Sequence, residues 1–210
     1  MARNLDPKCK QCRREGEKLF LKGERCFTQK CAAVKRNYPP GQTGQNQSRR
    51  KISEYGVQLR EKRKAQKFYN VLEKQLRNYY LEANKKQSAT GKTIIQLLEK
   101  RLDNVVFRLS LTKSRSQARQ MVSHGHVRVN DQRVTIPSYS VKVGDVIEVT
   151  KATRQKKGFA NIIKEIRKEE VPSWLEVNTK NATGKIVREP TLDDVGHKIN
   201  TSLIVEFYSR

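Results

Sequence analysis

Three consecutive blocks between residues 101 and 130 constrain the fold of this chain most strongly. Residues 101–109 are mainly apolar and indicate a helix. Residues 114–120 begin with a serine suited to cap a second helix, which carries basic side chains at helical spacing. Residues 124–130 begin His-Gly-His and lead into a hairpin. Two short helices and a hairpin make a compact module that gathers polar and basic side chains on one surface, which suits a structured RNA.

The charge of the chain agrees with a polyanionic partner. Its 210 residues include 45 Lys and Arg against 21 Asp and Glu, giving a formal net charge of +24. Repulsion of that size is best tolerated when nucleic acid neutralises it. A membrane surface is the alternative polyanion, but we find no apolar run of 18 residues, no export signal and no lipidation motif. We therefore expect a cytoplasmic protein with no membrane partner.

The first part of the chain looks least able to form a hydrophobic core. Residues 1–51 carry 14 basic and 4 acidic side chains, and residues 38–44 form a Pro/Gly-rich stretch that cannot continue a helix. From residue 53 to about residue 83, apolar and aromatic side chains recur at helical spacing. Thr93 is expected to cap the next helix, which would extend to residue 109.

Short strands are expected in the second half. Residues 127–129 and 132–134 flank Asn130-Asp131, a plausible two-residue hairpin turn, and residues 146–149 form the next strand. A short helix is expected after Gly158. Three further strands are expected at 174–177, 184–187 and 203–208.

These patterns predict an α+β fold, with a mostly helical body, an inserted helix-plus-hairpin RNA-binding module and a zinc-ordered N-terminal arm. The predicted domains are a cysteine-rich arm at 1–48, a helical domain at 49–98, the module at 99–150, and a C-terminal helix and strands at 151–210 that pack on the helical domain.

Four cysteines form a candidate metal site. Cys9 and Cys12 are three positions apart, and Cys26 and Cys31 are five apart. Two closely spaced pairs of thiolates can close a tetrahedral structural site, for which one Zn²⁺ ion fits best. An iron–sulfur cluster or no metal at all remain alternatives, whereas disulfides would need an oxidising compartment.

The basic surfaces supply the candidate RNA contacts. Arg115 and Arg119 share a helix face with no carboxylate four residues away, so we expect them to be the central phosphate contacts. His124 and His126 are as well suited to cap helix carbonyls as to contact RNA. The full set of predicted RNA-binding residues is Arg13, Arg14, Lys22, Ser114, Arg115, Gln117, Arg119, His124, His126 and Arg128.

The chain resembles the S-four family of bacterial small-subunit ribosomal proteins along its whole length, in the form that bears zinc. The matching blocks are residues 9–16, 21–26, 38–42, 55–62, 101–105, 116–120, 124–126 and 205–210. The module at 99–150 alone is less specific, because RNA-modifying and tRNA-charging enzymes also carry it.

This resemblance implies a structural protein of the small ribosomal subunit that binds ribosomal RNA at a multi-helix junction in the 5′ domain, nucleates assembly of the subunit body and contributes to translational accuracy. It implies that Arg49, Arg50 and Lys51 face incoming mRNA, beside the third and fifth small-subunit proteins. It places the interface with the fifth protein at Asp193, Asp194, Phe207 and Tyr208. Some members also bind their own mRNA. An organelle-encoded origin remains open.

No catalytic motif is evident, since the chain has no phosphate-binding loop, nucleophile elbow or carboxylate pair in a catalytic setting. Three alternative functions make different demands on the chain. An RNA-modifying enzyme would need a further catalytic domain, a heat-shock-type RNA-binding protein would lack the cysteine arm, and a zinc-dependent DNA-binding regulator would prefer duplex DNA.

Overall fold

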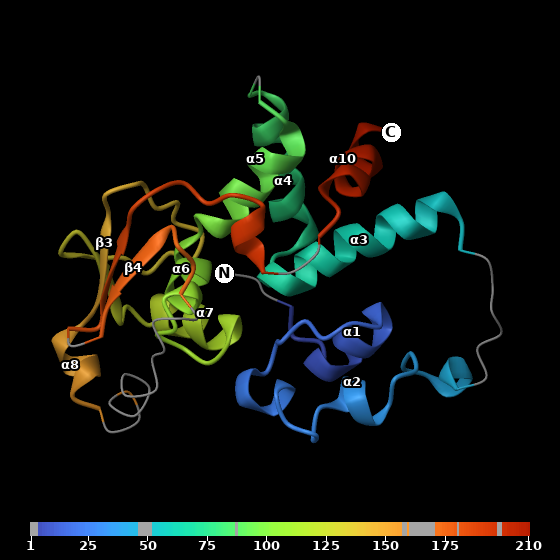
Figure 1. Cartoon of the computed structure of the whole chain (residues 1–210), viewed down its shortest axis with the longest axis horizontal. Helices are drawn as coiled ribbons and strands as arrows, with labels where there is room; N and C mark the ends of the chain where they lie inside the picture. The colour runs from blue at the N-terminus through green and yellow to red at the C-terminus, as the bar shows by residue number, and fades with distance from the viewer. Residues whose placement is uncertain are drawn as a thin grey trace. The chain divides into compact units, whose positions relative to one another are not determined.

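The structure is a computed structural model that describes residues 4–45, 52–86, 88–156, 159, 171–179, 181–196 and 199–210. The chain divides into two compact units. The helical unit comprises Met1–Ile94 and His197–Arg210, and the sheet unit comprises Ile95–Gly196 (Figure 1). Among the described residues, no helix is both long and apolar enough to cross a lipid bilayer.

The helical unit is built from short N-terminal helices and two longer central helices. Its elements are α1 (Lys8–Glu15), η1 (Gly23–Cys26), α2 (Ala32–Lys35), η2 (Gln42–Gly44), α3 (Glu54–Tyr69), α4 (Glu73–Asn84), the first half of α5 (Thr90–Glu99) and α10 (Thr201–Ser209). Helix α10 packs along α3 and also meets α4 (Figure 1). The segment closest to the end of the chain therefore completes the helical unit.

Two sequence expectations about helices differ from the structure. The helical stretch at 53–83 is broken at Asn70, which adopts the left-handed conformation (φ 54°) and ends α3. Thr93 does not cap a helix, because it lies within α5, where its hydroxyl bonds the carbonyl of Ala89 at 3.3 Å. A second break at Lys100–Arg101 separates α5 from α6 (Leu102–Arg108).

The sheet unit packs two helices against one face of a five-stranded sheet. The strands are β1 (Val127–Val129), β2 (Gln132–Arg133), β3 (Val146–Val149), β4 (Leu175–Asn178) and β5 (Thr183–Ile186), in the order β2-β1-β3-β5-β4 with every pair antiparallel. Helices α6 and α7 (Arg115–Ser123) cover the core face, and the short α8 (Lys151–Arg154) follows β3 (Figure 1).

The hairpin and the sheet register follow from turn chemistry and close packing. Asn130 and Asp131 both have positive φ (47° and 65°), as a tight two-residue turn requires, so the predicted hairpin is confirmed. The strand predicted at 146–149 is also confirmed. Gly184 sits against Leu109, where an added Cβ would lie 2.4 Å from the leucine side chain and would force it to shift, so glycine allows β5 to approach the end of α6 closely.

The C-terminal segment differs from the sequence expectation in two ways. Residues 203–208 form α10 and not a strand, because Asn200 caps a helix by accepting hydrogen bonds from the backbone N–H groups of Ser202 and Leu203. Strands β4 and β5 belong to the sheet unit, where β5 pairs with β3 and extends the sheet of the module. The helix expected after Gly158 falls mostly outside the described residues.

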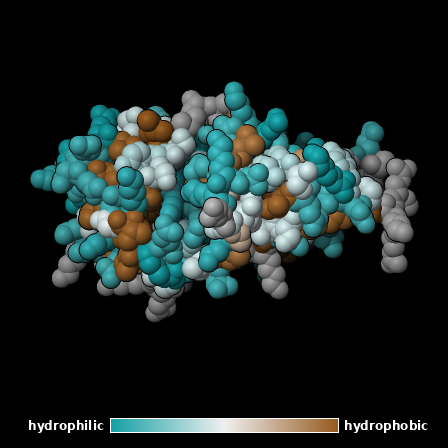
Figure 2. Space-filling view, turned by 90° about the horizontal axis from the view of Figure 1, so that it is seen from above, coloured by the Kyte–Doolittle hydropathy of each residue, from teal (hydrophilic) through white to brown (hydrophobic). Residues whose placement is uncertain are grey.

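The surface of the molecule reflects its composition. Figure 2 shows a face that is largely hydrophilic, on which smaller hydrophobic areas are separated from one another. The apolar side chains of the sheet unit lie instead in one core that includes Leu102, Val105, Ile147 and the fully buried Trp174. The charged face is therefore available for a polar partner, while the core fixes the geometry of the module.

Candidate RNA-binding surfaces

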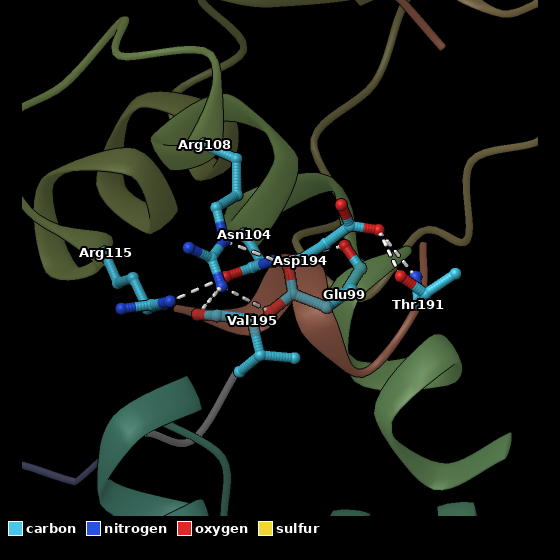
Figure 3. A network of polar contacts seen from close by, with 7 residues as sticks. All are labelled: Glu99, Asn104, Arg108, Arg115, Thr191, Asp194 and Val195. Atoms are coloured by element: carbon cyan, nitrogen blue, oxygen red, sulfur yellow. Dashed lines mark hydrogen bonds and ion pairs between the residues drawn. The ribbon is translucent and has the colours of Figure 1, made fainter. Parts of the chain in front are cut away.

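A buried polar network holds α5, α6 and α7 together. The Glu99 side chain is fully buried and accepts hydrogen bonds from Asn104 Nδ2 (2.7 Å) and from two nitrogens of Arg108 (3.0 and 2.7 Å). Arg108 also donates to the carbonyl of Val195 at 2.6 Å, and Arg115 Nε donates to Asn104 Oδ1 at 2.9 Å (Figure 3). A buried carboxylate is tolerated here because each oxygen receives a charge-assisted or amide hydrogen bond.

The expectation that Arg115 and Arg119 project outward as the central phosphate contacts is wrong. Both are buried, with 7% and 4% of their surfaces exposed. Arg119 lies 3.4 Å from a carboxylate oxygen of Asp103, which also receives two hydrogen bonds from Arg101, and the Arg115 guanidinium lies over the Phe107 ring at 4.4 Å. Spacing along α7 shows that the two arginines share a face, but α6 covers that face and supplies the carboxylate of Asp103.

The first turn of α7 has the predicted capping arrangement. The Ser114 hydroxyl accepts a hydrogen bond from the backbone N–H of Gln117 at 3.3 Å, which confirms Ser114 as the N-cap. The exposed Gln117 side chain accepts in turn from the backbone N–H of Lys113 at 3.0 Å. The role of both residues in RNA binding stays a prediction.

At the other end of α7, two histidines and an arginine form an exposed cluster. Gly125 (φ 70°) ends the helix as predicted, and the rings of His124 and His126 lie nearly parallel with centroids 6.1 Å apart. Arg133 packs across Gly125 and donates to the carbonyl of His124 at 3.1 Å. We call His124, His126 and Arg133 the histidine cluster.

The histidine cluster is electropositive. Burial lowers the pKa of His126, and its neighbours Lys156, His124 and Arg133 lower it further. Its Nδ1 atom is within 2.9 Å of the Thr153 hydroxyl, which fixes the ring orientation. Sequence reasoning did not find Arg133 and Lys156, because the hairpin and the end of α8 bring them to His126 only in the folded chain.

Arg128 projects from the sheet as expected, but it has an acidic neighbour. It is exposed between the buried Val127 and Val129, and its guanidinium is 3.7 Å from Glu148 directly across the β1–β3 pair. Arg154 also binds Glu148, at 3.0 Å. Because the Arg128 side chain is 45% exposed and its contact with Glu148 is long, Arg128 remains able to contact a phosphate.

All four cysteines lie within the described residues, and none forms a disulfide. No group of three or more His, Cys, Asp or Glu side chains in the described part of the chain is arranged to hold a metal ion. Burial raises the pKa of the Cys12 thiol, a backbone hydrogen bond with Leu19 lowers it, and the charges of Cys26, Cys9 and Cys31 raise it again. The thiols therefore lie near enough to affect one another, and zinc stays a prediction.

The three basic residues predicted on the arm differ in their surroundings. Arg13 donates to the carbonyls of Arg36 and Tyr38 at 3.2 and 3.0 Å and stacks on the Tyr38 ring, so it holds the Pro/Gly-rich stretch in place. Arg14 is exposed and donates to the Pro40 carbonyl at 3.2 Å. Lys22 is exposed, and its side chain is suited to a phosphate contact.

The remaining predicted site residues have different surroundings. Arg49, Arg50 and Lys51 lie outside the described residues. Asp194 already has a partner within the sheet unit, because its carboxylate accepts hydrogen bonds from both terminal nitrogens of Arg188 at 2.9 Å. Asp193 is exposed.

Phe207 and Tyr208 belong to the other unit, on α10. Tyr208 stacks on Tyr80 and donates to Glu73 at 2.9 Å, and Phe207 contacts the Tyr55 ring. These contacts anchor α10 within its own chain, and the interface with the fifth small-subunit protein stays a prediction.

Comparison with known proteins assigns the family. Residues 3–99 match the model of the ribosomal protein S4/S9 N-terminal domain, and residues 100–147 match that of the S4 domain. Among curated proteins, the small ribosomal subunit proteins uS4 of Caldicellulosiruptor bescii, Nitrosospira multiformis and Clostridioides difficile are 50%, 51% and 51% identical, each over 100% of both chains. This chain belongs to the uS4 family. The S4-domain match covers α6, α7, β1, β2 and the start of β3, so the histidine cluster lies on the part of the chain that defines the uS4 module.

Proposed function

We propose that this chain is a structural, non-enzymatic constituent of the small ribosomal subunit that binds ribosomal RNA. The observation that carries the proposal is the match to uS4 proteins over the full length of the chain. The net charge of +24 fits a polyanionic partner, and the α7–hairpin end of the sheet unit carries Arg128, Arg133, Lys156 and two histidines.

The histidine cluster and Arg128 are the contacts that we propose in the sheet unit. Imidazole and guanidinium groups can donate hydrogen bonds to phosphate oxygens, and the planar rings can also stack on bases. The buried Arg115 and Arg119 act indirectly, since their contacts with Asn104 and Asp103 fix the orientation of α7 against α6. Contacts with the phosphate backbone of the RNA position the protein, and the shape of the RNA supplies the selectivity.

The finer role follows from the family resemblance. We propose binding at the multi-helix junction of the 5′ domain, nucleation of subunit assembly, and a position where mRNA enters the subunit, with Arg49, Arg50 and Lys51 facing the message. The third and fifth small-subunit proteins are the proposed neighbours, and Asp193 is the exposed member of the predicted interface. Binding to its own mRNA is a further proposal.

The test of RNA binding is a titration of the full chain onto the 5′-domain junction RNA and onto a scrambled RNA of equal length, at two salt concentrations. We expect a preference of 100-fold or more for the junction that survives high salt, and a log–log salt slope of roughly −0.7 to −0.9 per neutralised phosphate. Equal affinities that fall together with salt would contradict the proposal.

A charge-reversal pair tests the surface. Arg133→Glu is expected to weaken junction binding by about tenfold or more and to reduce the magnitude of the salt slope by about 1, because a phosphate contact is lost. Lys142→Glu makes the same change of charge at an exposed position of the 141–144 loop and serves as the control. Equal effects of the two variants would indicate a general loss of positive charge and not a contact at the histidine cluster.

We also propose one structural Zn²⁺ ion held by Cys9, Cys12, Cys26 and Cys31. The chemistry of the donors fits, because four thiols in two closely spaced pairs are the ligand set of a closed tetrahedral site, although among the described residues no three of them are arranged around one ion. The backbone N–H of Lys22 points at Cys26 Sγ at 3.4 Å, and Leu19 makes a backbone hydrogen bond with Cys12. Hydrogen bonds of this kind orient the ligands of a metal site.

Metal analysis of the full chain tests the zinc proposal. One equivalent of zinc per chain is expected, with Cys12→Ser losing it and a chelator exposing the arm to proteolysis. An equivalent of iron with visible absorbance would support the cluster alternative. A metal-free chain with a protease-resistant arm would overturn both.

A further inference from the structure

Two aromatic rings of the N-terminal arm contact each other, and one of them is exposed to solvent. The rings of Phe20 and Phe27 contact each other with centroids 5.1 Å apart and an interplanar angle of 31°. Phe27 is 77% exposed, whereas Leu19 and Leu21, which flank Phe20 in the sequence, are buried. Phe20 has a positive φ of 51°, which is unfavourable for a residue with a bulky side chain. The backbone is therefore held in an uncommon conformation that places Phe20 beside a ring left in solvent.

A cationic hollow lies on the same segment. It has a volume of about 540 Å³ and is lined by Glu24, Arg25, Thr28, Lys30 and Lys35. Three cations against one carboxylate leave it positive. Arg25 and Thr28 lie within two residues of Phe27 in the sequence. The Arg25 Nε donates a hydrogen bond to the Lys30 carbonyl at 3.4 Å, which connects two of the residues that line the hollow. A platform for a planar group and a site for an anion are thus adjacent.

We propose that Phe27, supported by Phe20, stacks on an unpaired nucleobase, and that the cationic hollow holds a phosphate of the same strand. An aromatic ring beside a cationic groove is the arrangement that proteins use for single-stranded nucleic acid, because every base offers a π-face and every nucleotide a phosphate. A protein partner fits less well, since the side chains that surround Phe27 are cationic and not apolar. The inference rests on the proposed RNA-binding function and adds a single-stranded site on the arm.

Substitutions at position 27 test the stacking directly, and exposure of the side chain means that they do not threaten folding. Phe27→Ala and Phe27→Leu are both expected to weaken binding of the full chain to the junction RNA by about fivefold or more, because stacking requires a ring. Phe27→Tyr keeps the ring and should bind like the wild type. Leu81→Ala, which removes an exposed apolar side chain from α4, is the control.

A fluorescent reporter separates this inference from the proposed function. The chain has one tryptophan, Trp174, which is fully buried, so the wild type supplies the background for a Phe27→Trp variant. We expect a 12-nucleotide single-stranded RNA to quench the emission of Phe27→Trp, and an RNA duplex of the same length to quench it much less. Quenching by the single strand would support the arm site even if the wild type showed no preference for the junction.

The same variants can also overturn the proposed stacking site at Phe27. If Phe27→Trp is not quenched by single-stranded or junction RNA, and Phe27→Ala and Phe27→Leu bind the junction like the wild type, the arm site is overturned. Junction specificity in the wild type would then still uphold the proposed function, and the exposed ring would be assigned to a protein neighbour.

Discussion

Asp103 accepts hydrogen bonds from one buried arginine and pairs with a second. Its carboxylate receives Arg101 Nε and a terminal nitrogen at 3.0 and 2.7 Å, and Arg119 lies 3.4 Å away. Removing one partner of a buried ion pair leaves uncompensated charge. We predict that Asp103→Ala lowers the free energy of unfolding by about 3–5 kcal/mol, measured by urea denaturation. The exposed Glu176→Ala on β4 should change it by less than about 0.5 kcal/mol. Similar losses in both variants would refute the importance of this pair.

Asp194 makes stability depend on pH. Burial raises the pKa of its carboxyl group, but hydrogen bonds from Arg188 and Thr191 outweigh this effect and bring the pKa to about 2. A pKa below the unfolded value means that the stabilisation is present above about pH 4 and is lost as the pH falls towards 2. We predict that Asp194→Asn abolishes about 1–2 kcal/mol of the loss that the wild type shows between pH 4 and pH 2, followed by chemical denaturation. A wild-type pH profile in the variant would contradict this prediction.

At the scale of the element, α10 is held by its aromatic residues. Phe207 contacts Tyr55 and lies under the ammonium group of Lys62, which is 4.0 Å from the ring centroid, and Tyr208 bonds Glu73. We predict that Phe207→Ala lowers stability by about 2–4 kcal/mol and speeds hydrogen exchange in α10, because packing on α3 is lost. Ser209→Ala at the exposed end of the same helix is the control. Unchanged exchange in Phe207→Ala would mean that other contacts hold the helix.

Comparison of elements shows what the sequence could and could not predict. The hairpin and the end of α7 were predictable, because Asn130-Asp131 and Gly125 satisfy local backbone requirements. The run of branched and aromatic residues at 203–208 predicts a strand, but the Asn200 cap and packing on α3 override that preference and give helix α10. Burial of Arg115 and Arg119 was not predictable from spacing, because the covering acid comes from another helix. Recognition of the family depended on blocks along the whole chain.

At the scale of the whole molecule, salt should act with opposite sign on folding and on binding. A net charge of +24 destabilises the free chain by self-repulsion, and salt screens it, since the Debye length falls from about 10 Å at 0.1 M to about 3 Å at 1 M. We predict that raising sodium chloride from roughly 0.1 to 0.5 M increases the Tm of the free protein by about 3–5 °C. Buried pairs such as Arg108–Glu99 are screened less and do not reverse this effect.

The complex with junction RNA supplies the internal comparison. There the phosphates already neutralise the cations, so the same increase in salt should lower the Tm of the protein as RNA affinity falls. Thermal unfolding of the free protein and of the complex in matched buffers measures both effects. A Tm of the free protein that falls with salt would mean that exposed ion pairs such as Arg128–Glu148 outweigh the repulsion. A Tm of the complex that rises would mean that the contacts with RNA are not governed by phosphate charge.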